Sequence, residues 1–271
     1  MTRLTALVLA GTRAGGDPLA EYAGVSHKAL IEVGGRTMVE RVVEALAASA
    51  EIERIVVAIE RPELLAGLAG LAPPRCAKPL ETMPTEPGGP SATVAAALRV
   101  LGVPLLVTTA DNALLETAWL SEFLAAIPAE VDLAAALARR DAVEAAAPDT
   151  RRTWLRFADG DHSGCNLFLL ARPKAANAIA FWQTLEGERK RPLRMVRRLG
   201  WTFALRYALG RLSMAAAAAR LGELAGGGAR FAIVALRDGR AAIDVDKPDD
   251  LDLVRRLVAA APRAPTQPRR T

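Results

Sequence analysis

The sequence has few cysteines and no long apolar run. Two cysteines, Cys76 and Cys165, provide neither a disulfide framework nor a cluster of metal ligands. No apolar run reaches the roughly 18 residues that a membrane-spanning helix needs. Residues 4–10 are apolar but stop at Gly11 without a signal-peptide cleavage pattern, so we expect a strand there rather than a leader. These absences favour a cytoplasmic protein.

Acidic residues are scarce in two segments. Residues 186–211 contain eight basic and two acidic residues, and residues 262–271 add three arginines. Because the formal net charge of the whole chain is only +5, the rest of the chain is net negative. A local basic patch suits phosphate-bearing substrates or an anionic membrane surface. Nucleic acid is not expected as a partner, because neither an aromatic-interleaved basic sheet nor a recognition helix accompanies the patch.

Apolar runs alternate with helical segments along most of the chain. The first runs are continuous rather than alternating, which is typical of parallel strands buried on both faces. We expect strands over residues 3–10, 52–59, 104–110, 131–138, 153–158, 166–170, 231–236 and 241–245. The alternation predicts an α/β fold with a mostly parallel sheet flanked by helices.

Capping residues and prolines mark the expected helix starts. Thr37 and Glu40 have the spacing of a capping box, which predicts a helix to about residue 49. Ser91 is expected to be the N-cap of the helix that follows it. Pro62 and Pro248 stand near the first turns of two further helices, the second ending near residue 260.

One segment departs from this pattern. Residues 186–228 are almost entirely helical in composition, so we expect a helical insertion there. Residues 1–261 are expected to form a single domain that includes this insertion. The Pro/Arg-rich residues 262–271 are predicted to be a disordered tail.

The basic part of the insertion, residues 186–211, has two interpretations. A helix from Leu193 would have a basic face with Arg194, Arg197, Arg198 and Trp201, and an apolar face with Leu193, Val196, Leu199, Phe203 and Tyr207. It could be an ordinary amphipathic helix that packs its apolar face on the domain. Alternatively, it is an interfacial helix or lid at the inner face of a membrane. Lys190 and Arg191 would then bind the phosphate of a partly apolar acceptor.

Chemically useful residues follow the first expected strand. In open α/β sheets, ligands bind beyond the carboxyl ends of the strands. Ala10, Gly11 and Thr12 lead into a Gly-rich loop whose backbone N–H groups can approach phosphate oxygens, although the same residues also suit a plain turn. Lys28, further along this loop, is either a solvated surface charge or a phosphate ligand.

Two aspartates stand at the ends of other expected strands. Asp111 follows the apolar run 104–110 and is either a turn cap or a ligand of Mg²⁺, which prefers one or two carboxylates. Asp246 precedes the last helix and is either its N-cap or a second metal carboxylate. Asp249 and Asp250 fall in the first turn of that helix, where negative charge is favourable, so we expect them to be structural.

Several segments together resemble one protein family. The segments are LVLAG, HKALIEVGGRTMVERVVEAL, GGPSATVAAAL, TTADNALL, SGCNLFLL and IDVDKPDDLDLV. In this order they resemble the MobA-like NTP transferases and sugar-1-phosphate nucleotidyltransferases. The resemblance covers most of residues 4–46, 86–116, 163–170 and 241–258. It implies the GT-A nucleotidyltransferase fold, which is Rossmann-like.

The resemblance assigns roles to individual residues. It implies that the backbone of Ala10, Gly11 and Thr12 holds the nucleotide and that Ser91 belongs to the segment closing over the base. Lys28 would neutralise the nucleotide phosphates. In the same way it implies that Mg²⁺ is held by the carboxylates of two aspartates and that an asparagine faces the acceptor; these residues are Asp111, Asp246 and Asn166.

The loop departs from the family pattern at one position. The family usually has a second glycine followed two residues later by an arginine, whereas here Gly16 occupies the arginine position and Arg13 comes early. The resemblance leaves open whether Arg13 replaces that catalytic arginine.

The predicted reaction joins a nucleoside monophosphate from an NTP, CTP or GTP, to a sugar, alcohol or lipid phosphate and releases pyrophosphate. One alternative is a GT-A glycosyltransferase, which would normally have an Asp-x-Asp motif where Asp111, Asn112 and Ala113 stand. The other is a non-catalytic nucleotide-binding protein of the same fold. The sequence does not define the oligomeric state.

Overall fold

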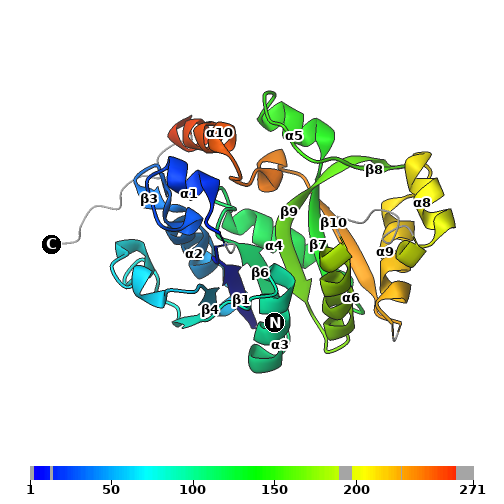
Figure 1. Ribbon diagram of the computed structural model, residues 1–271, viewed down its shortest axis with the longest axis horizontal. Helices are drawn as coiled ribbons and strands as arrows, with labels where there is room; N and C mark the ends of the chain where they lie inside the picture. Colours follow the sequence, from blue (N-terminus) through cyan, green and yellow to red (C-terminus); the bar gives the residue numbers. More distant parts are fainter. Residues whose placement is uncertain (1–2, 13–14, 189–196, 227, 261–271) are drawn as a thin grey trace.

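A computed structural model describes residues 3–12, 15–188, 197–226 and 228–260 (Figure 1). An eight-stranded sheet forms its centre, in the order β10-β7-β9-β6-β1-β4-β5, with β8 paired to β9. The strands are β1 (Leu4–Leu9), β4 (Ile52–Ala58), β5 (Leu80–Met83), β6 (Leu105–Thr109), β7 (Leu133–Arg139), β8 (Leu155–Phe157), β9 (Gly160–Leu170) and β10 (Phe231–Leu236). β9 runs antiparallel to β6 and β7, and β8 antiparallel to β9, while the other neighbours are parallel. The predicted mostly parallel α/β sheet is confirmed.

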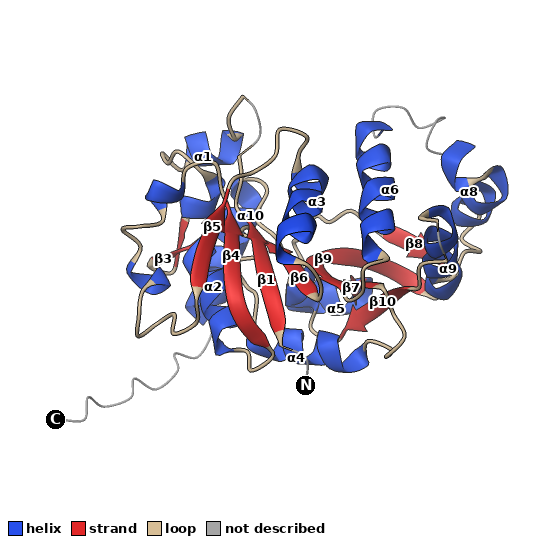
Figure 2. Cartoon of the chain, turned by 90° about the horizontal axis from the view of Figure 1, so that it is seen from below, coloured by secondary structure: helices blue, strands red, loops and turns tan. Residues whose placement is uncertain are grey.

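Helices cover both faces of this sheet (Figure 2). One face carries α3 (Pro90–Leu101), α6 (Ala175–Glu188) and α9 (Met214–Leu224), and the other carries α2 (Met38–Ala48), α4 (Thr117–Ala126) and α5 (Arg140–Ala146). Further elements are α1 (Pro18–Tyr22), α8 (Trp201–Ala208), α10 (Pro248–Ala260), the β2–β3 ladder (Glu32–Val33, Arg36–Thr37) and the 3-10 turns η1 (Lys28–Leu30), η2 (Pro62–Leu64), η3 (Ala69–Leu71) and η4 (Gly239–Ala242). Within the described ranges, no helix is both long and apolar enough to cross a bilayer.

The core lies on both faces of the central strands. In β1, Ala6 and Val8 join the cluster beneath α2 and α4, whereas Leu7 joins the cluster beneath α3 and α6. β6 divides in the same way, with Leu106 on one side and Val107 on the other. Burial on both faces explains why these strands are continuous apolar runs in the sequence.

The predicted capping box opens α2. The Thr37 hydroxyl accepts a hydrogen bond from the Glu40 N–H at 3.3 Å, and the Glu40 carboxylate accepts one from the Thr37 N–H at 2.8 Å. Glu40 also accepts a hydrogen bond from the Gly70 N–H at 2.7 Å. The same side chain therefore starts α2 and fastens η3 against it.

Three predicted element boundaries are wrong. Gly89 is the N-cap of α3, the helix starts at Pro90, and Ser91 lies inside it. The expected helix at Pro62 is only the short 3-10 turn η2. The expected strand over residues 241–245 is replaced by η4 and an extended segment that pairs with no strand of the sheet.

The helical segment near residues 186–228 differs from the prediction in extent. Its helical structure begins earlier, at Ala175 in α6, and continues in α8 and α9. The expected continuous helix from Leu193 is wrong over its described part, because Gly200 has φ +99° and separates helical residues 197–199 from α8. Trp201 therefore does not share one helix face with Arg197 and Arg198. Whether residues 1–261 form a single domain stays a prediction, and the expected disordered tail, 262–271, lies outside the described residues.

Candidate active site

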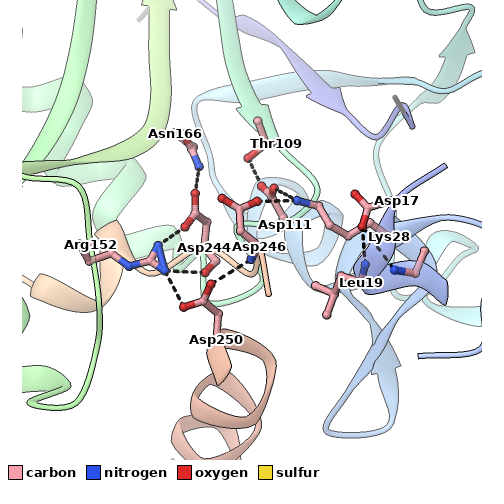
Figure 3. A network of polar contacts seen from close by, with 11 residues as sticks. Asp17, Leu19, Lys28, Thr109, Asp111, Arg152, Asn166, Asp244, Asp246 and Asp250 are labelled. Atoms are coloured by element: carbon pink, nitrogen blue, oxygen red, sulfur yellow. Dashed lines mark hydrogen bonds and ion pairs between the residues drawn. The ribbon is translucent and has the colours of Figure 1, made fainter. Parts of the chain in front are cut away.

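Lys28 stands at the carboxyl edge of the sheet between two carboxylates (Figure 3). It is the first residue of η1, and its Nζ lies 2.6 Å from Asp111 Oδ2 and 2.8 Å from Asp246 Oδ1. Burial alone would lower the pKa of Lys28, but the two carboxylates outweigh this effect and raise it well above its usual value. Lys28 is therefore a charged ammonium at neutral pH, in the position where three distant segments of the chain meet.

Asp111 is positioned by the end of β6. The Thr109 hydroxyl donates to Asp111 Oδ1 at 2.5 Å, and the Asp111 carbonyl accepts a hydrogen bond from the Val245 N–H at 3.1 Å. The next side chain, Asn112, is buried and donates to the Cys165 carbonyl at 3.2 Å. These contacts tie the end of β6 to β9 and to the loop before α10.

Asp244 belongs to the same cluster, although the sequence argument did not single it out. Its Oδ2 accepts a hydrogen bond from Asn166 Nδ2 at 2.8 Å, and its Oδ1 pairs with Arg152. Burial raises the pKa of Asp244; Arg152 opposes this rise, and the charges of Asp111 and Asp246 add to it. The Asp-x-Asp spacing of residues 244 and 246 in the sequence could have indicated that Asp244 belongs to the site.

Asn166 occupies an unusual backbone conformation on β9. Its φ of +48° lies in the left-handed region, which asparagine tolerates better than most residues. The pairing of β7 with β9 shifts register between Ala135 and Leu137, close to this position. The Asn166 amide points toward Asp244, so the structure brings this predicted acceptor residue to the edge of the carboxylate cluster (Figure 3).

A buried arginine holds the loop that carries Asp244 and Asp246. The Arg152 side chain is only 8% exposed; it donates to the Asp244 carbonyl at 2.9 Å and to Asp250 Oδ1 at 3.2 Å. Asp250 also accepts a hydrogen bond from the Asp246 N–H at 3.2 Å. The expected structural role of Asp250 thus includes fixing the loop before α10. Sequence reasoning did not identify Arg152, which lies about a hundred residues before its partners.

The predicted nucleotide loop lies beside Glu60. The Ala10 N–H donates to the Ala58 carbonyl at 2.9 Å, which continues the pairing of β1 with β4. The Thr12 N–H donates to Glu60 Oε1 at 2.8 Å. A Cβ atom at Gly11 would lie 2.7 Å from Thr85 Cγ2 and 2.9 Å from Glu60 Oε1, so a larger residue here would displace these side chains. The nucleotide-binding role of these residues stays a prediction.

The remaining predicted residues are placed differently. Ser91 is buried between α3 and α6, where its hydroxyl donates to the Glu186 carboxylate rather than facing Lys28. Arg13, Lys190 and Arg191 lie outside the described residues.

Asp111 and Asp246 have the donor chemistry that magnesium requires. Both place a carboxylate oxygen within 2.8 Å of one cationic centre, the Lys28 ammonium, so both carboxylates can bind the same cation. Mg²⁺ commonly takes one or two carboxylates and completes its octahedron with water and phosphate oxygens. In the described part of the chain, no group of three or more His, Cys, Asp or Glu side chains is arranged to hold a metal. The two aspartates therefore fit a magnesium ion that shares its remaining ligands with a substrate.

Solved structures with the same fold are nucleotidyltransferases. One is 4-diphosphocytidyl-2C-methyl-D-erythritol synthase from Anaerococcus prevotii, with a TM-score of 0.56, 10% identity, and coverage of 95% of this chain and 99% of that one. Another is CMP:2-keto-3-deoxy-manno-octonic acid synthetase complexed with CTP, with a TM-score of 0.52, 15% identity, and coverage of 95% and 99%. This chain thus has the GT-A-like fold of nucleotidyltransferases.

The family follows from closer matches. The sequence model of the MobA-like NTP transferase domain matches residues 6–198. A hypothetical transferase from Thermus thermophilus is 34% identical, with a TM-score of 0.77, over 92% of this chain and 100% of that one. No curated protein sequence matches the chain. The chain belongs to the MobA-like NTP transferase family and is an enzyme of the nucleotidyltransferase class.

Proposed function

We propose that this enzyme uses Mg²⁺ to transfer a nucleoside monophosphate from an NTP to a phosphorylated acceptor, with release of pyrophosphate. The observation that carries the proposal is the convergence of Lys28, Asp111 and Asp246 at the carboxyl edge of the sheet. A partly buried ammonium and two carboxylates there suit triphosphate chemistry. The acceptor is a sugar, alcohol or lipid phosphate.

The reaction needs charge stabilisation rather than a covalent nucleophile. An oxygen of the acceptor phosphate attacks the α-phosphorus in line as pyrophosphate leaves, and negative charge accumulates on the phosphate oxygens. Lys28 stays protonated because of its raised pKa, so it offers a fixed positive charge to these oxygens. Bound at Asp111 and Asp246, Mg²⁺ would add positive charge at the same oxygens.

Neighbouring residues hold this arrangement in place. Arg152 and Asp250 fix the loop of Asp246, and Thr109 fixes Asp111. Such prepositioning matters because small displacements of charged groups sharply reduce catalytic rates. Asn166 lies next to the cluster with its Nδ2 bound to Asp244, which leaves its Oδ1 for a donor group of the acceptor.

CTP is the first nucleotide to test, with GTP second. Two of the similar structures carry cytidyl or CMP in the names of their products. Their low identity to this chain supports the fold alone, so these names only order the candidates.

A pyrophosphate-release assay tests the proposal. The purified chain is incubated with Mg²⁺, each of the four NTPs, and a panel of sugar, alcohol and lipid phosphates. Release with one NTP–acceptor pair is expected for the wild type and is lost in Lys28→Ala and Asp111→Asn. The matched surface variants Lys174→Ala and Asp252→Asn retain it. Nucleotide binding without pyrophosphate release across the panel would contradict the proposed reaction.

A further inference from the structure

Exposed large apolar side chains are concentrated on α8. In the described part of the chain they are Tyr22, Val100, Trp201, Leu205 and Leu209. The last three are 67%, 60% and 57% exposed and follow one another at intervals of four residues. This spacing places them in one stripe along a single helix face and its final turn. Tyr22 and Val100 are isolated on other elements.

The opposite side of α8 packs against the protein, so the stripe faces outward. The Tyr207 hydroxyl accepts a hydrogen bond from the Arg156 N–H at 3.3 Å, and the Tyr207 ring meets Phe157 edge-on at 6.4 Å between centroids. After the helix, the Leu212 carbonyl accepts a hydrogen bond from the Ala158 N–H at 2.8 Å. These contacts fasten α8 to the β8–β9 hairpin, so the stripe faces away from the protein.

Two exposed arginines flank the stripe. Arg206 lies on α8 beside the stripe and Arg211 follows the helix, and both are exposed. Long arginine side chains can extend from an apolar surface and keep their charge at a polar boundary. The surface is therefore apolar along its middle and cationic at its sides.

This combination favours an anionic lipid surface over a second copy of the chain. Helices that lie in the membrane interface have an apolar face with tryptophan and leucine, flanked by arginine or lysine. Tryptophan is itself enriched at the level of the lipid headgroups. A symmetric dimer through the same patch would bring two cationic surfaces together, because a two-fold interface pairs each patch with itself.

We propose that the exposed face of α8 docks on the surface of an anionic lipid bilayer. Trp201, Leu205 and Leu209 lie at the boundary of headgroups and acyl chains, and Arg206 and Arg211 contact lipid phosphates. α8 packs against β8, at the end of the molecule far from β5 (Figure 2). β8 pairs with residues 160–162 of β9, the strand that carries Asn166 further along. The docking holds whether or not the acceptor is itself a lipid.

Vesicle flotation with the full chain tests the docking. The vesicles contain phosphatidylcholine alone or phosphatidylcholine mixed with phosphatidylglycerol. We expect the wild type to float only with the anionic vesicles and less at high salt, since salt screens the arginine contacts. The triple variant Trp201→Ser/Leu205→Ser/Leu209→Ser should bind at least about a hundredfold more weakly, because it removes the apolar contact area.

A second variant and a matched control separate the contributions. Arg206→Gln/Arg211→Gln should bind anionic vesicles about twenty-fivefold more weakly, since each arginine near such a surface contributes about fivefold. The control Arg99→Gln/Val100→Ser replaces an exposed arginine and an exposed apolar residue on α3 and should bind like the wild type. Circular dichroism checks that every variant is folded.

Three outcomes would overturn the docking proposal. The first is that the wild type does not bind anionic vesicles. The second is that it binds neutral vesicles equally well, and the third is that the triple variant floats as the wild type does. Sedimentation without lipid adds a fourth: a wild-type dimer that the triple variant converts to monomer would identify the stripe as a contact between copies. None of these readouts depends on nucleotidyl transfer, so the docking can fail while the proposed reaction stands.

Discussion

Lys28 shows how a residue acquires a role that its type does not dictate. Most lysines are solvated surface charges. Here the side chain is 20% exposed and contacts carboxylates that are 83 and 218 residues away along the chain. The carboxylates compensate the cost of burying the ammonium, and they keep it charged. The position of Lys28 is thus a product of the fold, while its chemistry was visible in the sequence.

Removing the Arg152 side chain is expected to lower the unfolding free energy more than removing any other arginine of the site. In Arg152→Ala, Asp244 and Asp250 would lose the cation that neutralises them in a buried environment. Breaking such a buried pair typically costs about 3–5 kcal/mol of unfolding free energy. Urea denaturation measures the loss. The neighbouring exposed Arg151 provides the control, and Arg151→Ala should change stability by no more than about 0.5 kcal/mol. Equal stabilities of the two variants would contradict the network.

Even one additional methyl group at Gly11 is expected to lower the unfolding free energy. In Gly11→Ala the new Cβ would press against the Thr85 side chain and the Glu60 carboxylate. Displacing these two side chains is expected to cost about 1 kcal/mol of unfolding free energy, at the low end of overpacking effects, because Gly11 is exposed. Thermal or urea denaturation gives the value, and Gly67→Ala, whose Cβ would meet no atom within 4 Å, is the matched control. A Gly11→Ala protein as stable as Gly67→Ala would show that the loop is not tightly packed.

At the scale of elements, α2 is the helix whose start was best specified by its sequence. Thr37 and Glu40 form both hydrogen bonds of the predicted capping box. The contact of Glu40 with the Gly70 N–H was not predictable, because nothing in the local pattern indicates where η3 will pack. Burial would raise the pKa of Glu40, but the N–H groups of Thr37 and Gly70 donate to the carboxylate and lower it overall.

This lowered pKa predicts a pH-dependent contribution to stability. The unfolded chain has an ordinary glutamate pKa of about 4.3. Because the folded-state pKa is lower, the contribution is fully present above the unfolded value and is lost as pH falls through the folded one. Glu40→Gln should therefore cost about 1–3 kcal/mol at neutral pH and flatten the loss of stability on acidification. Urea denaturation across pH tests this, with Glu44→Gln on the same helix as control. A wild-type pH profile in Glu40→Gln would contradict the assignment.

Other element boundaries show where local patterns mislead. Ser91 is a good N-cap by type, but Pro90 prefers the first helical position, and the helix starts there with Gly89 as its cap. The apolar residues 241–245 have a strand-like composition, yet the sheet already ends at β10 on that side. Gly200 lies inside the helix expected from Leu193, but its positive φ separates one helical segment from the next. Boundaries of this kind depend on tertiary neighbours.

At the scale of the whole molecule, the parallel α/β architecture was predictable because strands buried on both faces are continuous apolar runs. The reversed direction of β9 was not predictable, since composition does not encode strand direction. Lys28 and the two predicted metal carboxylates could be located because each stands at a strand end or beside a loop. Arg152 and Glu60 could not, because their contacts arise only when distant segments pack together.

The central claim is that the Lys28 cluster transfers the α-phosphate of an NTP together with its nucleoside. The most direct measurement uses CTP or GTP labelled either at the α-phosphate or at the γ-phosphate. Each is incubated with Mg²⁺ and the acceptor that the pyrophosphate-release assay has identified, and the position of the label is then determined. We expect the α-label to enter the acceptor and the γ-label to appear in pyrophosphate. Both transfers should be abolished in Lys28→Ala and retained in Lys174→Ala. Transfer of the γ-label to the acceptor, or α-label transfer that persists in Lys28→Ala, would contradict it.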